Sequence, residues 1–398
     1  MQSHPILDQV LIGYSPVIDS HRALVATRLI VSPDRPEAAP EGAALLAAVL
    51  DAFEPGPPQR GAGLPPLLLS LTSEPWLDGV LAAALNAPAA LLIEVPAFLA
   101  ADPARAQRLQ ALRAAGQPLA VSGQLTPEAQ RSLPDGVGFR VADVQDAAAG
   151  PDLPSLPVLR SNARLGADID AALARGDRAV IGWPMDDEIS ISQPAGVPPE
   201  VRGIVELMNR VERGEPAERM EAVLTSDPTL AFRLLRYLNS SAFGLRSEVT
   251  SFKHALMLLG HQRLKRWLAL LLASGSKNVA VRPVMHVAAR RGLIMEEMAR
   301  GIGDEAMRGE MFICGVFSLL DRLLRQPMAE LMRSVPVQQR VQQSLLGEGP
   351  YAQHLALVRA IEQASVWDVR ETAERLMLGR GELNHALLRA LSAARELD

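Results

Sequence analysis

Two observations predict an α/β domain followed by an all-α domain. Between residues 9 and 184, short runs rich in Val, Leu and Ile alternate with amphipathic helical stretches. This alternation is typical of a parallel sheet covered by helices, either open or closed into a TIM-like barrel. After residue 199 only helical periodicity remains. The run MDDEISISQPAGVPP between the two halves is acidic and then rich in Pro and Gly, which favours a linker. We therefore place the α/β domain at 1–185, the linker at 186–198 and the all-α domain at 199–398.

In the first domain, each predicted strand is a short apolar run bounded by Pro, Gly or polar residues. The strands are expected at 24–31, 67–71, 89–95, 119–121, 138–141, 157–159 and 179–181. Helices are expected at 42–53, 103–115, 126–132 and 168–175, with Gly116 and Gly176 as C-terminal caps. In the second domain, helices are expected at 201–211, 251–259, 284–300, 311–325, 337–346, 351–364, 369–378 and 382–396.

The composition excludes several functional classes. Of the 398 residues, 48% are hydrophobic and 21% are charged, as in soluble globular proteins, and the net charge of −5 gives no general attraction to nucleic acid. The first residues, MQSHPILDQVLIGY, lack the basic region of a signal peptide, and the apolar runs are too short to cross a bilayer. Cys314 is the single cysteine, which excludes an internal disulfide, and we expect it to be buried and inert. We expect a cytoplasmic protein that neither binds nucleic acid nor inserts into a membrane.

The second domain is organised around the stretch SDPTLAFRLLRYLNSSAFG at residues 226–244. Ser226 is the expected N-cap of a helix, with Asp227 favourable at its positive end and Pro228 in its first turn. Leu230, Leu234 and the leucines that follow form one apolar face. No catalytic group stands out in this stretch, so the residues themselves indicate a packing unit.

This stretch and residues 249–268 resemble the signature of the HDOD domain, an all-helical relative of the HD phosphohydrolases that lacks their metal-binding residues. The resemblance rests on Asp227, Pro228, Leu230, Leu234, Leu235, Asn239, Ser240, Phe243, Gly244, Ser251, Ala255, Leu256, Leu259 and Gly260. It implies a helical fold that acts through protein contacts. HDOD proteins with a preceding EAL domain are implicated in motility, biofilm formation or second-messenger control.

The first half resembles that EAL domain, a TIM-barrel-like phosphodiesterase that hydrolyses cyclic di-GMP with two divalent metals. Residues 14–19 (YSPVID) stand at the family's Gln-Pro-Ile strand, so Ser15 replaces the glutamine that reads the nucleotide. Arg28 stands at the metal-binding glutamate of the motif that names the family. Arg28 is a permanent cation and has no lone pair to offer a metal.

Most of the other ligand positions of the EAL family also carry residues that do not bind a divalent metal. Ser70 stands at the asparagine ligand, and Ser122 and Gly123 fall on the Asp-Asp-Phe motif. Arg140 falls near the catalytic lysine. Glu94 survives as a carboxylate, and we interpret it as a strand-end residue paired to Arg28. Two-metal catalysis needs several converging carboxylates, so the resemblance implies a degenerate EAL domain without catalytic, metal-binding or cofactor-binding residues.

The second half also lacks the metal dyad of the HD phosphohydrolases. His286 is a candidate for a first ligand, but the expected His-Asp pair falls on Phe317 and Ser318, with Asp321 displaced. The basic cluster of Arg263, Lys265 and Arg266 adjoins Trp267. Because Trp267 lies on an apolar stripe, we interpret the cluster as a solvated helix face rather than a nucleic-acid site.

From these observations we predict a non-enzymatic bacterial signalling protein that requires no cofactor and binds other signalling proteins. The alternative is a cyclic di-GMP receptor whose barrel binds the nucleotide without hydrolysing it, although the loss of the nucleotide-reading glutamine at Ser15 argues against it. The sequence does not name the partner or the oligomeric state.

Overall fold

The computed structural model describes residues 4–35, 41–53, 63–88, 90–123, 137–146, 156–188, 201–227, 230, 233–234, 252–274, 279–301 and 304–395. The chain divides into two compact units. The barrel unit contains residues 1–187, 282–287 and 356–398, and the helical unit contains residues 188–281 and 288–355. Within the described residues, no helix is long and apolar enough to cross a membrane.

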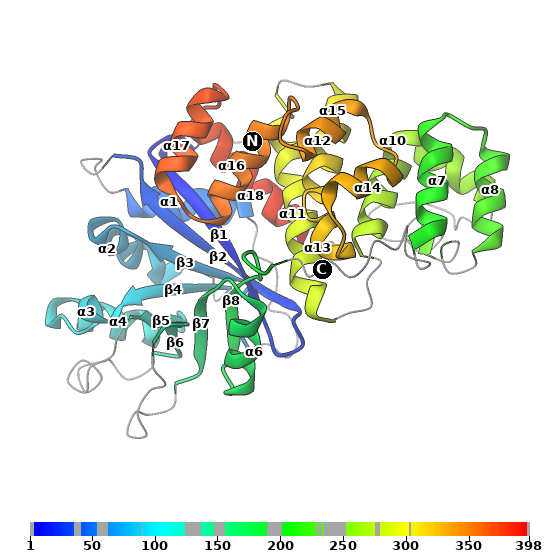
Figure 1. Cartoon of the computed structure of the whole chain (residues 1–398). Helices are drawn as coiled ribbons and strands as arrows, with labels where there is room; N and C mark the ends of the chain where they lie inside the picture. Colours follow the sequence, from blue (N-terminus) through cyan, green and yellow to red (C-terminus); the bar gives the residue numbers. More distant parts are fainter. Residues whose placement is uncertain are drawn as a thin grey trace. The chain divides into compact units, whose positions relative to one another are not determined.

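The barrel unit contains a closed barrel of eight strands in sequence order (Figure 1). The strands are β1 (Val10–Ile18), β2 (Leu24–Pro33), β3 (Leu67–Leu71), β4 (Leu91–Pro96), β5 (Leu119–Ser122), β6 (Phe139–Asp143), β7 (Val158–Ala163) and β8 (Ala179–Gly182). The helices are η1 (Pro5–Asp8), α1 (Gly42–Phe53), α2 (Glu74–Ala83), η2 (Ala84–Asn86), α3 (Ala97–Ala100), α4 (Pro103–Ala114) and α6 (Gly166–Ala174). The closed form of the predicted α/β sheet is therefore the one observed. The helix expected at 126–132 lies outside the described residues.

Strand β1 was not among the strands expected from apolar runs, and it also departs from the expected parallel arrangement. Strands β2 to β8 run parallel, whereas β1 is antiparallel to both β2 and β8. Only a short turn joins β1 to β2, and a parallel crossover needs a much longer connection. Asp19 stabilises this turn, because its Oδ1 accepts hydrogen bonds from the backbone N–H groups of His21 and Ala23, both at 2.9 Å.

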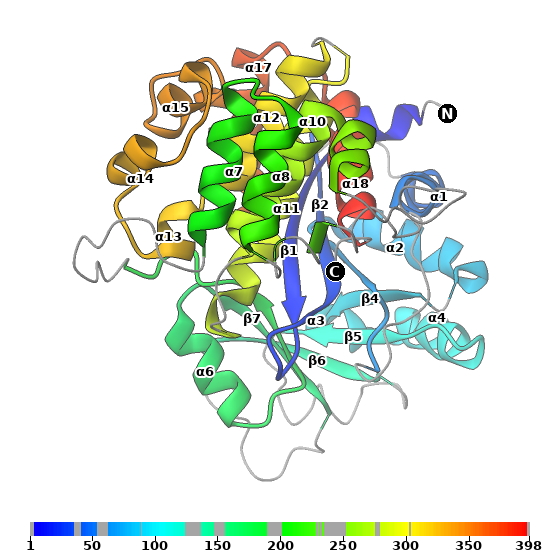
Figure 2. The same cartoon turned by 90° about the vertical axis from the view of Figure 1, so that its right-hand side faces the viewer.

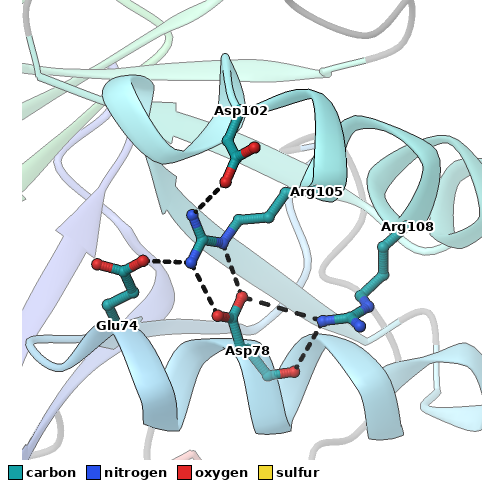
Figure 3. A network of polar contacts seen from close by, with 5 residues as sticks. All are labelled: Glu74, Asp78, Asp102, Arg105 and Arg108. Atoms are coloured by element: carbon teal, nitrogen blue, oxygen red, sulfur yellow. Dashed lines mark hydrogen bonds and ion pairs between the residues drawn. The ribbon is translucent and has the colours of Figure 1, made fainter.

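An arginine on α4 ties the outer helices together (Figure 3). Arg105 donates from Nε and Nη2 to the two carboxylate oxygens of Asp78 on α2, each at 2.8 Å, and from Nη1 to Asp102 at 2.9 Å. Its Nη2 also donates to Glu74 on α2. This Arg105 hydrogen bond is the main reason that the pKa of Asp78 lies below its usual value. The sequence prediction missed α2, whose first turn contains a proline and whose interior contains Gly79.

The helical unit consists of α7 (Arg202–Glu212), α8 (Ala217–Ser226), α10 (Phe252–Ala273), most of α11 (Arg282–Met298), α12 (Glu305–Phe317), α13 (Leu320–Leu324), α14 (Met328–Ser334) and α15 (Gln339–Leu345), with η5 (Val279–Val281) before α11. Helices α7 and α8 lie side by side (Figure 2). Helices α11 and α12 cross closely, because a Cβ at Gly315 would lie 2.5 Å from the Arg291 carbonyl oxygen. Cys314 is buried, as the sequence predicted.

The end of the chain belongs to a different unit from the one that the sequence suggested. The predicted all-α domain ran to residue 398, but residues 356–398 cluster with the barrel. They carry the end of α16 (Ala352–Glu362), α17 (Val366–Arg375) and α18 (Arg380–Ala394). Helix α18 packs against η1, α1 and β1. A helix was predicted at 382–396, but a helical pattern does not identify the surface against which the helix packs.

Candidate functional site

The barrel interior is closed by an apolar layer to which every strand contributes. This layer contains Val17, Val25, Ala26, Leu64, Leu68, Leu92, Ala120, Val141, Leu159, Ala179 and Ile181, with Phe139 packed against it. Side chains alternate between the two faces of a strand, so residues two positions further along share the interior face. The residues that follow this layer therefore line the C-terminal mouth of the barrel, where TIM-barrel enzymes place their active sites.

Four of the residues predicted from the EAL resemblance share this interior face. Arg28, Ser70, Glu94 and Ser122 lie two positions beyond Ala26, Leu68, Leu92 and Ala120 on β2 to β5. Gly123 follows Ser122 with a left-handed φ of 91°, and its N–H donates to the Val141 carbonyl at 3.3 Å, which ends β5. The structure thus brings these positions to one end of the barrel.

The centre of this mouth is an ion pair that the sequence predicted. Arg28 donates from Nε to Glu94 Oε2 at 2.9 Å and from Nη2 to Glu94 Oε1 at 2.8 Å. The same Nη2 also donates to Ser70 Oγ at 3.3 Å. The Arg28 side chain is 14% exposed and that of Glu94 is 5% exposed. The paired interpretation of Glu94 is therefore confirmed.

This arrangement does not fit a divalent metal. Both oxygens of Glu94 accept from one guanidinium group, and Ser70 Oγ accepts from the same group. A metal would have to displace Arg28 and then bind within reach of its positive charge. In the described part of the chain, no group of three His, Cys, Asp or Glu side chains could hold a metal ion.

Arg140 and Asp143 both lie on β6 but face opposite sides of the strand. Arg140 does not join Arg28 and Glu94, because its neighbours Phe139 and Val141 face the interior and Arg140 therefore faces outward. Asp143, which the sequence analysis did not select, shares the interior face with Val141. Its Oδ1 accepts from the Gln145 N–H at 2.9 Å, and its Oδ2 accepts from Asn162. The signal that would have found Asp143 is its two-residue spacing from Val141.

The helical unit confirms part of the HDOD pattern and corrects its helix start. Leu230, Leu234, Leu256 and Leu259 are buried, and Gly260 interrupts α10 with a left-handed φ of 67°. Ser226 was expected to be an N-cap, but it is the last residue of α8. Asp227 accepts from the N–H of Leu230, three residues ahead, at 3.0 Å instead, which is the contact of an N-cap side chain. Pro228, Asn239, Ser240, Phe243, Gly244 and Ser251 lie outside the described residues.

The position expected for the HD metal dyad holds no acid group. Ser318 Oγ donates to the Gly315 carbonyl at 2.7 Å and accepts from Arg291 Nη1 at 3.0 Å. Asp321 Oδ1 accepts from the backbone N–H of the next residue at 2.8 Å. A buried arginine therefore lies beside the serine at this position, as Arg28 lies beside the carboxylate in the barrel.

Two members of the basic cluster on α10, Lys265 and Arg266, are engaged within the helical unit, while Arg263 is exposed. Lys265 lies 2.6 Å from Glu212, and Arg266 lies 2.6 Å from Glu296 and stacks over the Phe312 ring at 4.3 Å. Trp267 is 4% exposed. A buried tryptophan has no free face on which a base could stack, in agreement with the packing role predicted for it.

Comparisons with known proteins match parts of the chain. Residues 197–344 match the family model of the HDOD domain. Uncharacterized protein YuxH of Bacillus subtilis (strain 168) is 32% identical over 168 residues, which are 41% of this chain and 41% of the relative. Cyclic di-GMP phosphodiesterase CdgJ of Vibrio cholerae serotype O1 is 25% identical over 181 residues, 45% of this chain and 42% of the relative. The match therefore spans about two fifths of each relative's length.

The chain is also similar to a solved structure, the PaMucR phosphodiesterase in complex with c-di-GMP. The matched region covers 46% of this chain and 94% of the PaMucR chain, with 14% sequence identity. The TM-score is 0.32, which is too low to support an argument about the fold. The family match covers α7 to α15, the helices in which the buried leucines and the Gly260 break were found. The chain therefore contains an HDOD domain at residues 197–344.

Proposed function

We propose that this protein is a non-catalytic bacterial signalling protein that acts through contacts with other proteins. In this proposal the barrel is a degenerate EAL domain and the HDOD domain supplies the protein-binding function. The HDOD match and the relative named as a cyclic di-GMP phosphodiesterase support a role in signalling. The observation that carries the non-catalytic part is the Arg28–Glu94 pair at the barrel mouth.

The electrostatics of this pair explain why it favours regulation over catalysis. Phosphodiester hydrolysis by two metals needs several carboxylates to offset two dipositive ions and to activate water. In this barrel, the carboxylate on β4 is already neutralised by a guanidinium group that has no lone pair to offer a metal. The other former ligand positions carry the uncharged residues Ser70, Ser122 and Gly123.

A hydrolysis assay with the full chain tests this proposal. Purified protein is incubated with cyclic di-GMP and Mg²⁺ or Mn²⁺, beside a Glu94→Gln variant as the matched control. We expect the same background from both proteins. Product that forms with the native chain and disappears with Glu94→Gln would refute the non-catalytic assignment.

The alternative is a receptor that binds cyclic di-GMP without hydrolysing it. Titration calorimetry with the full chain and cyclic di-GMP distinguishes this receptor from a protein that acts only through protein contacts. The full chain is required because residues 356–398 belong to the barrel unit, so residues 1–187 alone are an incomplete domain. No heat at high micromolar nucleotide would support action through protein contacts. Stoichiometric binding would establish the receptor in its place.

A further inference from the structure

Strand β1 has an edge that the barrel itself does not cover. Strand β2 pairs with β1 along its whole length, from Val10 to Ile18, but within the described residues β8 pairs with β1 only at Val17 and Ile18. Residues 10–16 therefore present one row of backbone N–H and C=O groups away from β2. An uncovered edge of this kind is a template for pairing with another strand.

One side chain of α18 takes the place of a neighbouring strand at this edge. Asn384 is 1% exposed, and its Oδ1 accepts from the Ile12 N–H at 3.3 Å. Its Nδ2 donates to the carbonyl oxygens of Val10 and Leu7, both at 2.8 Å. A primary amide offers the same acceptor and donor as a peptide group, so Asn384 satisfies Val10 and Ile12 as a paired strand would.

The same helix is held in place at both of its ends. The Gly381 N–H donates to Asp8 Oδ1 at 2.9 Å, and a Cβ at Gly381 would lie only 2.4 Å from that oxygen. At the other end, the Arg395 guanidinium lies 5.6 Å from the centre of the Phe53 ring on α1. These contacts fix the rotation of α18, so that Asn384 faces β1 (Figure 2 shows α18 beside α1).

The end of α16 covers the next part of β1. Tyr14 donates its hydroxyl to Glu362 Oε1 at 3.3 Å. A Cβ at Gly13 would lie 2.8 Å from Ala364 Cβ, so only glycine permits this approach. Pro16, further along, has no N–H, and strand alternation places this missing donor on the same edge as the Ile12 N–H. Asn384 thus satisfies the edge at Val10 and Ile12, Pro16 blunts it further along, and the end of α16 packs over the adjoining face of β1.

We infer that residues 356–394, the C-terminal strap, close the free edge of β1, and that Asn384 substitutes there for a strand. We further infer that the uncovered edge would pair with the same edge of a second copy of this chain. The strand VLIGYSPVI carries no charged residue, so no like-charge repulsion opposes self-pairing at residues 10–15, before Pro16. Two antiparallel copies of one edge also satisfy the two-fold symmetry of most homodimers.

The test replaces Asn384 with leucine, which has a similar volume and no hydrogen-bonding group. The control is Asn209→Leu on α7, because among the described residues the Asn209 amide donates within its own helix, at the Val205 carbonyl. Hydrogen exchange of peptides covering residues 10–16 is measured on the full chain, and light scattering gives the molecular mass over a range of concentrations. We expect exchange in β1 to rise by about tenfold or more, and a concentration-dependent dimer, in Asn384→Leu only.

Two results would overturn the inference. Unchanged protection of residues 10–16 in Asn384→Leu would show that Asn384 does not close the edge. Rapid exchange in a chain that stays monomeric at the highest concentration would show that the edge does not pair with a second copy. If Asn384→Leu fails to fold, Asp8→Ala is used instead, because it removes the acceptor of the Gly381 N–H and leaves Asn384 in place. It should raise β1 exchange by a smaller factor, and unchanged exchange there would also contradict the inference.

Discussion

Replacing Arg28 with methionine should destabilise the barrel unit by about 3–5 kcal/mol, because it leaves Glu94 buried without its partner. The structure supports this magnitude. Two charge-assisted hydrogen bonds, each worth about 1.5–3 kcal/mol, join the pair, and Glu94 is too buried for water to replace them. Methionine retains most of the length of the arginine side chain, so the change removes the charge rather than the volume.

The assay is a urea titration read by pulsed hydrogen exchange on peptides from β2 to β5, which reports unfolding of the barrel separately from the helical unit. Arg164→Met is the control, because Arg164 and its partner Asp186 are nearly half exposed and should contribute less than about 1 kcal/mol. The double variant Arg28→Met/Glu94→Gln removes both charges and should recover about 2 kcal/mol. An Arg28→Met barrel within about 0.5 kcal/mol of the native chain would refute the argument that Arg28 neutralises a buried carboxylate.

Three further perturbations test other parts of the structure. Gly42→Ala should lower the unfolding free energy by about 3 kcal/mol in a urea titration, because its Cβ would lie 2.1 Å from the Gly79 carbonyl carbon. The control Gly138→Ala should be well tolerated, because the nearest atom to its Cβ would lie 3.7 Å away. Equal losses in the two variants would contradict the close α1–α2 crossing. Burial lowers the pKa of His354 from 6.5, so the unfolded chain binds more protons, and the helical unit should lose stability as the pH falls below about 6.5. His354→Leu should flatten the pH dependence of the urea midpoint, and an unchanged slope would exclude this group. Arg105→Gln removes the positive charge shared by the carboxylates of Glu74, Asp78 and Asp102, and should lower the barrel's unfolding free energy by about 1–2 kcal/mol. High salt screens the repulsion between these carboxylates and should restore most of the loss. A loss that does not change with salt would indicate a packing role for Arg105 instead.

Much of the barrel was predictable because the strands from β2 to β8 are apolar runs between clear breaks. The strand expected at 67–71 was found with those bounds, and helix 42–53 likewise. The Arg28–Glu94 pair was predictable because both residues stand at ligand positions of the EAL resemblance, and a carboxylate that faces inward needs an opposite charge beside it. Arg140 was wrongly assigned to the barrel interior, because the run FRVAD on β6 does not indicate which of two adjacent residues faces inward. A shift of one residue reverses the facing of a strand.

The role of the chain's end could not be predicted from local pattern. The apolar stripe of α18 indicated a helix, but the stripe is equally compatible with packing on other helices or on a sheet. The informative residue was Asn384, a polar side chain among leucines and alanines at a position that the helical period places inside. A buried amide needs partners, and here they are backbone groups of a strand more than three hundred residues away.

The proposed absence of catalysis depends on the neutralisation of Glu94 by Arg28 at the barrel mouth. The most direct test is Mn²⁺ binding to the full chain, measured by electron paramagnetic resonance, with Glu94→Gln alongside. We expect both proteins to bind Mn²⁺ equally weakly, with less than one ion bound per chain. One Mn²⁺ or more bound per native chain and lost in Glu94→Gln would contradict this expectation.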